Sequence, residues 1–529
     1  MSAKTDTQPA SKENTDALIL ALLSSAISIS ALLFYLRHHA ILLYGDAMAH
    51  INIARRVFDS RTPGISQLGT VWLPLPHLLN IPFVLNDRLW HSGVGGSILS
   101  MVAYVAGVLG IFRLARGMAS RLVAWVAALI FALNPNLIYM QATAMTESLY
   151  LAFFIWTVVF FSEFVSSADS DSFTARRALE KCATMVWAAM LVRYDGWFLA
   201  ALVAGGVLIS AWRVRPVSTP VRRGLLVYVM LVGATGVLWL VYNYARYGKA
   251  LEFANGPYSA HAIWEHSKTP TWTSYPGEGS PRTGMLYFLK VSRLTVAGGQ
   301  TEYLLFAIAF IALLCVFYFA RQYLPWTILW YPAIFYMVCI AWGSVPIYFP
   351  NWWPFTYYNL RYGLQMLPAL ALFAALAIDF IGNLLPARRV AAAAVVLLIT
   401  VLSYASVWRN TPLVLREAQV NGSDRLRFEK ELAAELKRLP PGSTLMMDCS
   451  AYSGAIQLAG IPFERVLRES NPPYWEIALS RPAQSADYVI AIDRDAVASA
   501  VRVFPQNLES IATIGTPRGR HATIYRSVH

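Results

Sequence analysis

The amino-acid sequence predicts an all-α polytopic membrane bundle of about 11 transmembrane helices with a small C-terminal α/β domain outside the membrane. Two observations lead to this fold class. Of the 529 residues, 57% are hydrophobic and only 14% are charged, whereas soluble proteins have about 25% charged residues. The apolar residues also gather in runs long enough to cross a bilayer. Residues 17–408 are therefore predicted to form a membrane domain, and residues 409–529 a separate domain.

The first of these runs follows a polar segment, residues 1–16, which we expect to be disordered and cytoplasmic. This first run resembles a signal peptide in its position, but its length favours a retained signal anchor. The predicted spans are 17–36, 93–112, 122–140, 148–165, 182–192, 197–212, 224–243, 302–320, 325–343, 361–383 and 390–408.

Basic residues in short connections predict the orientation, because Lys and Arg are enriched in cytoplasmic loops. With the N-terminus in the cytoplasm, every short connection on that side is basic, as at Arg113, Arg116, Arg388 and Arg389. We expect an integral membrane protein, in a bacterial inner membrane. The segments expected outside are 37–92, 245–301, 344–360 and the domain 409–529.

The C-terminal domain has mixed helix and strand patterns. Residues 424–438 have the pattern of an amphipathic helix, which Pro440 and Pro441 close. Strand patterns occupy 444–448, 487–492 and 520–526.

Composition excludes several classes of function. The net charge of +13 falls mostly in loops between apolar runs, so it does not indicate nucleic-acid binding. The four cysteines give neither a disulfide framework nor metal-ligand spacing. The sequence has no nucleotide-binding glycine motif. We predict no cofactor and assign no metal ligands, and a divalent cation such as Mg²⁺ or Mn²⁺ stays an alternative that no clear motif supports.

Asp46 is the first candidate catalytic residue, because it comes directly after the first span in the segment YGDAMAH. His50 follows four residues later, so a helix places both on one face. Arg56 lies about 80° away around that helix. Asp46 could act as a general base, with His50 and Arg56 as substrate contacts. Alternatively, Asp46 is only the N-cap of a helix along the membrane surface.

The segment GTVWLPLPH supplies two further candidates, Trp72 and His77. The two prolines of this segment favour an extended approach, after which Pro76 opens a helix. Trp72 suits a sugar-stacking position. The alternative is a tryptophan of the aromatic belt at the membrane interface.

Glu147 stands at the start of the fourth span, on the same side of the membrane as Asp46. Two carboxylates near one membrane face could divide the roles of base and orienting group. The alternative is a helix cap formed by Thr146 or Glu147.

Two arginines lie at other outer ends of spans. Arg193 precedes Asp195 in the turn RYDGW, where it could hold a phosphate or simply pair with that acid. Arg361, followed by Tyr362, begins a late span and could bind phosphate or only extend to the interface. Lys249 belongs to the long segment 245–301, which we interpret as an acceptor cleft or a mobile loop.

These residues together resemble the GT-C superfamily of membrane glycosyltransferases, which includes protein O-mannosyltransferases and lipid A aminoarabinose transferases. The resemblance covers most of residues 17–408. It implies that Asp46 activates the acceptor hydroxyl and that Glu147 is the second acid near the site. It also implies that Arg193, with Arg361 as a further candidate, contacts the phosphate of a polyprenyl-phosphate sugar.

The sequence therefore predicts an inverting glycosyltransferase that moves a sugar from a polyprenyl-phosphate donor to a hydroxyl of a protein, lipid or glycan. The physical reason is independent of the resemblance. The donor is insoluble, so its phosphate must react at the interface, where cations can neutralise it. The alternatives are a membrane transporter, a flippase or ligase for lipid-linked glycans, and a non-catalytic assembly factor.

Overall fold

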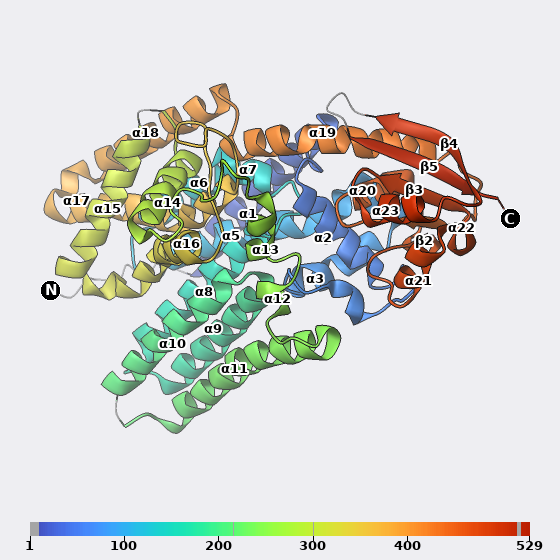
Figure 1. The fold of residues 1–529 in the computed structure, drawn as a ribbon. Coiled ribbons are helices and arrows are strands. Elements are labelled where there is room, and N and C mark those ends of the chain that lie inside the picture. The colour runs from blue at the N-terminus through green and yellow to red at the C-terminus, as the bar shows by residue number, and fades with distance from the viewer. Residues whose placement is uncertain (1–9, 215, 300, 516–519, 529) are drawn as a thin grey trace.

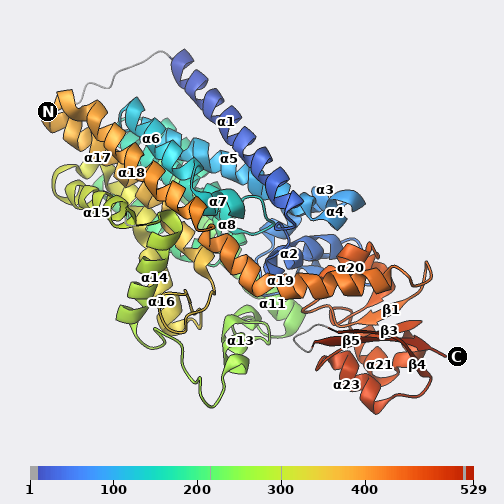
Figure 2. The ribbon, with the colours of Figure 1, turned by 90° about the horizontal axis from the view of Figure 1, so that it is seen from above.

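The computed structural model describes residues 10–214, 216–299, 301–515 and 520–528, and most of these residues are helical. The helices form an elongated bundle, and the one described sheet lies at the C-terminal end of the chain (Figure 1). Figure 2 shows the same arrangement from above, with the sheet domain at one end of the bundle. The predicted fold class, a helical membrane bundle with a small C-terminal α/β domain, is confirmed.

Within the described residues, nine helical stretches are long and apolar enough to cross a membrane. The predicted count of about 11 is not confirmed. The predicted span 122–140 is divided between α6 (Arg121–Ala132) and α7 (Pro135–Met140), and 182–192 belongs to α9 (Ser172–Val192), whose first half is charged. The nine stretches contain α1 (Ala10–Arg37), α5 (Val94–Arg116), α8 (Glu147–Ser167), α10 (Asp195–Arg213), α11 (Thr219–Tyr247), α15 (Glu302–Phe319), α16 (Tyr331–Trp342), α17 (Leu367–Leu384) and α18 (Arg389–Arg409).

The N-terminal segment is described only in part. Helix α1 begins at Ala10, so its first turns belong to the segment 1–16 for which we predict disorder. Residues 1–9 lie outside the described residues.

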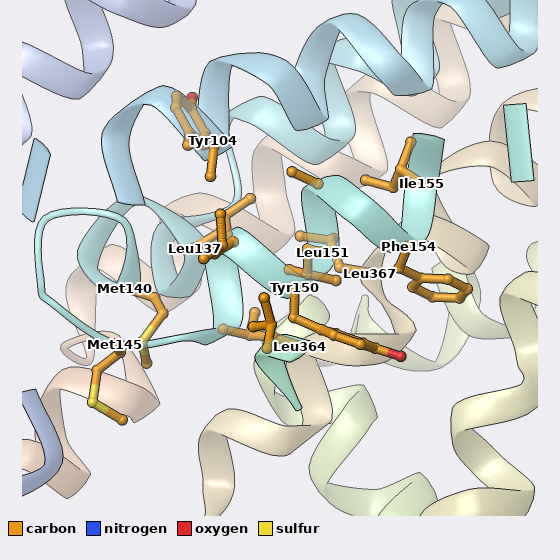
Figure 3. Packing of buried hydrophobic residues seen from close by; sticks show 14 of the residues in the cluster. Tyr104, Leu137, Met140, Met145, Tyr150, Leu151, Phe154, Ile155, Leu364 and Leu367 are labelled. Carbon is orange, nitrogen blue, oxygen red and sulfur yellow. The ribbon is translucent and has the colours of Figure 1, made fainter. Parts of the chain in front are cut away.

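The core of the bundle forms around α8, which packs against α5 and α9. Figure 3 shows Leu137, Leu151, Ile155 and Leu367 packed together there. A Cβ atom at Gly110 of α5 would lie only 2.8 Å from Ile155. The glycine therefore lets the two helices approach closely, as small residues do between membrane helices.

Helix α11 lies at the edge of the bundle and exposes large apolar side chains such as Leu226, Val229 and Leu238. Exposed apolar surface of this extent is unfavourable in water and is expected against lipid. The protein is therefore an integral membrane protein, as predicted.

The long outer segments contain helices of their own. Segment 37–92 forms α2 (Gly45–Arg56), α3 (Leu75–Val84) and α4 (Asp87–Ser92), with a 3₁₀ turn η1 (Ile65–Leu68) between the first two. Segment 245–301 forms α12 (Glu252–Asn255), α13 (Ala260–Ser267) and most of α14 (Pro281–Val296). Segment 344–360 leads into η3 (Leu360–Met366) at the start of the last but one span.

The C-terminal domain begins with α19 (Leu413–Leu436), which starts eleven residues before the predicted helix at 424. Its sheet has the strand order β2-β1-β3-β5-β4, parallel from β2 to β3 and antiparallel beyond. The three predicted strands are present. The strands are β1 (Leu445–Met447), β2 (Val466–Leu467), β3 (Tyr488–Ile492), β4 (Leu508–Gly515) and β5 (His521–Ser527), and the helices between them are α20 (Ser453–Ala459), α21 (Tyr474–Ser480), α22 (Pro482–Ser485) and α23 (Ala496–Val503).

This domain is joined closely to the first outer segment. A Cβ atom at Gly422 of α19 would collide with the backbone oxygen of Leu43, so the two backbones lie in direct contact. In addition, the Asn52 side-chain amide donates to the Ser453 hydroxyl at 3.1 Å. The C-terminal domain thereby fixes helix α2, which carries Asp46.

Candidate active site

Asp46 lies in the first turn of α2, one residue after the helix begins at Gly45. The N-cap is Tyr44, whose backbone is extended and whose side chain makes no capping bond. The alternative in which Asp46 itself caps the helix is therefore wrong. An acid in the first turn is favoured by the helix dipole. The Asp46 side chain is 40% exposed, so it remains open to a substrate.

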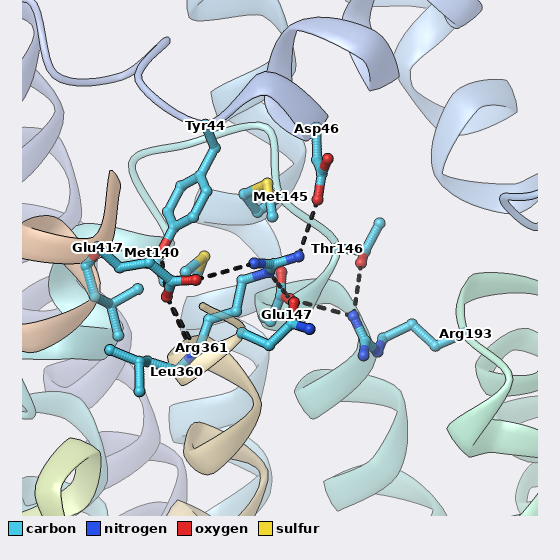
Figure 4. Close-up of polar contacts among 12 residues, drawn as sticks. Tyr44, Asp46, Met140, Met145, Thr146, Glu147, Arg193, Leu360, Arg361 and Glu417 are labelled. Carbon is cyan, nitrogen blue, oxygen red and sulfur yellow. Dashed lines mark hydrogen bonds and ion pairs between the residues drawn. The ribbon is translucent and has the colours of Figure 1, made fainter. Parts of the chain in front are cut away.

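Arg361 is the centre of the site, because three acids from separate segments contact its guanidinium (Figure 4). Its Nη2 donates to Asp46 Oδ2 at 2.9 Å, and its Nε donates to Glu147 Oε1 at 3.1 Å. Its Nη1 lies 3.4 Å from Glu417 Oε1. The planar fork of arginine allows each nitrogen to meet a different carboxylate.

Glu147 joins the two arginines of the site. It is the first residue of α8, and its side chain is fully buried. The same oxygen that contacts Arg361 also accepts a hydrogen bond from Arg193 Nη1 at 3.2 Å. Thr146 is the N-cap of α8, but its side chain makes no capping bond. It accepts instead from Arg193 Nη1 at 3.3 Å. Glu147 therefore holds the cationic groups in position.

Arg193 is the C-cap of α9, and Asp195 is the first residue of α10. Both charged side chains therefore lie at the turn between these helices. Arg193 Nε lies 3.3 Å from Asp195 Oδ2. The ion pair between these two residues, one of the two alternatives for Arg193, is therefore present. The arginine also donates to the hydroxyl of Tyr336 at 3.1 Å, and this hydroxyl donates to Asp195 at 2.6 Å. Arg193 is thus held by two acids and a tyrosine.

Tyr362 places an aromatic ring beside both arginines. The guanidinium carbons of Arg193 and Arg361 each lie 5.0 Å from the centre of its ring. The ring is also stacked on Tyr336, with 5.1 Å between the ring centres. Cation–π contacts of this kind favour the charged form of arginine in a partly desolvated place.

Glu417 and Tyr44 complete the site and have no signal in the sequence that identifies them. Glu417 is buried in α19, and its Oε2 accepts a hydrogen bond from the Tyr44 hydroxyl at 3.0 Å. The same oxygen accepts the backbone N–H groups of Leu360 and Arg361, at 3.1 and 3.4 Å. Burial raises the pKa of Tyr44, so its hydroxyl keeps the proton that it donates.

His50, Trp72 and His77 form a second group, close to the first. His50 Nδ1 lies 2.9 Å from His77 Nε2, and the ring of His50 lies 4.9 Å from Trp72. Burial lowers the pKa of His50 to about 4, although the nearby Asp46 carboxylate opposes this shift. Burial also lowers the pKa of His77. Both rings are therefore neutral at pH 7, and one donates its single proton to the other.

Two predicted substrate contacts lie away from these groups. Arg56 is at the opposite end of α2 from Asp46, where it approaches Glu469 of the C-terminal domain at 4.0 Å. Lys249 is exposed in the turn that follows α11. In the part of the chain that the structure describes, neither residue forms an ion pair with Asp46 or Glu147.

The arrangement has a defined electrostatic character. Four acids surround two arginines at the ends of several spans, and only Asp46 among the acids is well exposed. No group of three or more His, Cys, Asp or Glu side chains suited to a metal ion occurs among the residues described. The site can therefore offer a carboxylate and two fixed cations to a ligand.

Comparison with solved structures shows a shared fold, so the predicted resemblance is confirmed for the fold alone. No protein-family model and no curated protein matches this chain.

The similar structures include ArnT from Cupriavidus metallidurans, bound to undecaprenyl phosphate. It has a TM-score of 0.60 and 14% sequence identity, and the match covers 98% of each chain. The apo state of the same protein has a TM-score of 0.60 and 12% identity, over 95% of this chain and 97% of the other. The oligosaccharyltransferase AglB from Archaeoglobus fulgidus has a TM-score of 0.47 and 12% identity, over 96% and 74% of the two chains.

Proposed function

We propose that this protein is an inverting glycosyltransferase that moves a sugar from a polyprenyl-phosphate donor to a hydroxyl acceptor at the outer face of the membrane. One observation carries this proposal. Arg361 contacts the exposed carboxylate of Asp46 and, through the buried Glu147, is linked to Arg193. A carboxylate that can act as the base and two arginines that can bind phosphate thus converge at the ends of the spans.

The donor side of the reaction requires positive charge. When the bond between the anomeric carbon and the phosphate oxygen breaks, the lipid phosphate leaves with the electron pair. Fixed cations that await this charge stabilise the transition state. Arg193 and Arg361 are suited to this role because their guanidinium groups are held in place before the donor arrives. On binding, a phosphate oxygen takes the place of Asp46 at Arg361.

The acceptor side requires a base. The exposed Asp46 carboxylate, released from Arg361, takes the proton of the acceptor hydroxyl while the oxygen attacks the anomeric carbon. A single displacement of this kind inverts the configuration at that carbon. Trp72, close to His50 and hence to Asp46, offers a ring against which the sugar can stack. The buried Glu147 has an orienting role rather than a role as base.

The solved relatives support the proposed donor. The ArnT structure contains undecaprenyl phosphate, and the AglB structure contains dolichol phosphate and an inhibitory peptide. A polyprenyl-phosphate sugar is the corresponding donor for this chain, and the acceptor is a hydroxyl of a protein, lipid or glycan. The proposed location is a bacterial inner membrane, with the N-terminus in the cytoplasm and the C-terminal domain outside.

The test is a transfer assay with purified protein, radiolabelled polyprenyl-phosphate sugars and a panel of hydroxyl acceptors. We expect labelled glycoside from the unmodified protein and none from Asp46→Asn, which keeps the size of the side chain but cannot accept the proton. Full transfer by a folded Asp46→Asn variant would exclude Asp46 as the base.

Asp87→Asn is the matched control. Asp87 belongs to the same outer segment, is 66% exposed and pairs with Arg55 at 2.9 Å. Since the buried Arg55 keeps its second acid, Asp59 at 2.7 Å, this variant keeps its transfer activity. The panel also includes lipid-linked oligosaccharides, because transfer of whole glycans would indicate a ligase. Movement of the donor across liposomes without glycoside formation would indicate a flippase or transporter.

A further inference from the structure

A second pair of arginines lies where α2 meets the C-terminal domain. Arg56 is the last residue of α2, and Arg468 directly follows strand β2. Tyr247, at the end of α11, and Tyr258, before α13, lie close enough to Arg56 to raise its pKa. Three segments distant in sequence therefore meet around these arginines.

Neither guanidinium group is hydrogen-bonded to a carboxylate within the described residues. The Arg56 side chain is only 13% exposed, and it forms no hydrogen bond within the described residues. Its nearest acid is Glu469 at 4.0 Å, a contact too long for a hydrogen bond. Arg468 is fully buried and donates to neutral groups, namely the Ser470 hydroxyl, the Gln67 side-chain oxygen at 2.7 Å and the Ser60 hydroxyl at 3.3 Å. The Nε atoms of both arginines are buried without a partner in the described structure.

The acids nearby are already engaged. Glu469 Oε2 accepts the backbone N–H of Cys449 at 2.9 Å, and Asp59 binds Arg55 at 2.7 Å and the backbone N–H of Glu464 at 3.0 Å. Asp448 accepts from the backbone and hydroxyl of Ser450.

Neither arginine therefore has a carboxylate within hydrogen-bond distance among the described residues. Burial and the charge of Arg56 lower the pKa of Arg468 to about 9, and burial lowers the pKa of Arg56. Since guanidinium groups in proteins stay charged, an added anion would relieve this cost. The Arg56 side chain keeps 13% of its surface exposed, so a ligand can approach the pair from the side of Arg56.

We propose that Arg56 and Arg468 form a subsite that binds an oxyanion, a phosphate or carboxylate, on the acceptor. The assignment of this oxyanion to the acceptor rests on the proposed function, whereas the binding of an oxyanion by the two arginines does not. Arg56 lies ten residues from Asp46 on one helix, which corresponds to about 15 Å along the axis. The acceptor would therefore carry its negative group about that distance from the hydroxyl that receives the sugar.

The experiment is a calorimetric titration of the full-length protein in detergent with inorganic phosphate. Excess polyprenyl phosphate is present throughout, so that the arginines around Glu147 are occupied. We expect saturable binding to the unmodified protein and a Kd at least tenfold higher for Arg56→Gln. Arg56 is chosen because its loss breaks no hydrogen bond in the described structure, whereas Arg468 supports the fold. Arg56→Lys retains the charge but not the fork, and we expect an intermediate Kd.

Arg427→Gln is the matched control, since Arg427 is an exposed arginine of the same outer domain. We expect its Kd to equal that of the unmodified protein. Equal affinity in Arg56→Gln, or no saturable binding at all, would overturn the proposal. A parallel titration with acetate at equal ionic strength distinguishes the two ligands, because tighter binding of acetate identifies a carboxylate and tighter binding of phosphate a phosphoryl group.

The transfer assay separates this proposal from the proposed function. With an anionic acceptor, Arg56→Gln should raise KM at least fivefold and change kcat little, while a neutral acceptor should show no difference. If the unmodified protein transfers no sugar but binds phosphate through Arg56, the proposed function fails and the oxyanion site stands.

Discussion

Glu417 holds Arg361 from two sides, because one carboxylate oxygen lies 3.4 Å from its guanidinium and the other accepts its backbone N–H. Glu417 belongs to the helix that leads into the C-terminal domain, whereas Arg361 begins a membrane span. The C-terminal segment thus supplies part of the candidate site rather than only covering it.

Glu417→Gln should therefore weaken both stability and transfer. The amide keeps its size but loses the charge that balances Arg361, and removing one partner of a buried ion pair costs about 3–5 kcal/mol. We expect a lower unfolding temperature in detergent and a fall in kcat/KM. Glu431→Gln, at an exposed position of the same helix, is the control and should change neither.

Arg361→Lys should be nearly as inactive as Arg361→Gln. Three different nitrogens of Arg361 contact Asp46, Glu147 and Glu417. The single ammonium of lysine cannot reproduce that geometry. We expect kcat/KM to fall by about 100-fold in both variants, which corresponds to about 2.7 kcal/mol of transition-state stabilisation. Size-exclusion profiles check the fold, and activity above half in Arg361→Lys would mean that charge alone suffices.

Tyr336→Phe tests whether Arg193 must be oriented. The change removes only a hydroxyl, which accepts from Arg193 at 3.1 Å and donates to Asp195 at 2.6 Å. The loss of these hydrogen bonds corresponds to about 1.4 kcal/mol, or a tenfold fall in kcat/KM. Tyr318→Phe, at a side chain that is 72% exposed, should retain full activity. Unchanged kinetics in Tyr336→Phe would show that Arg193 is oriented by the acids alone.

The buried histidine pair predicts loss of stability in acid. Burial lowers the pKa of His50 to about 4, below its ordinary value of 6.5, and lowers that of His77 as well. The unfolded chain therefore binds protons first, so the stabilisation is complete above pH 6.5 and is lost as the pH falls towards 4. For His50 this amounts to about 3 kcal/mol. Unfolding temperatures between pH 7.5 and 4.5 measure the effect.

His50→Asn and His77→Gln should each flatten that pH dependence, because each removes a group that must be neutral in the fold. The exposed His261 gives the control, and His261→Gln should follow the profile of the unmodified protein. If all three variants share one profile, the acid sensitivity has another origin.

The positions of Asp46, Glu147, Arg193 and Arg361 could be predicted because each lies at the end of an apolar run. Such an end is visible in the sequence, and the topology then puts all four on one side of the membrane. Their direct contacts with one another could not be predicted. A run of apolar residues gives the length of a span but not its neighbours in the bundle.

The role of Glu417 could not be predicted from the sequence. It lies in a charged, amphipathic helix, where an acid most often faces solvent, and its partner Tyr44 is 373 residues away. The contact between His50 and His77 is similar, since it depends on how α2 packs against α3. Arg56 does lie on the same helix as Asp46, as the spacing predicts. However, it lies too far along α2 to reach the partners of Asp46.

The contact between Glu417 and Arg361 also has a consequence for biosynthesis. Asp46, Glu147, Arg193 and Arg361 all leave the ribosome before Glu417, and the helices that carry them are inserted earlier. Until α19 arrives, the backbone at Leu360 and Arg361 has no acceptor from that helix. The nascent protein therefore lacks the Glu417 contacts of this site until α19 has been translated.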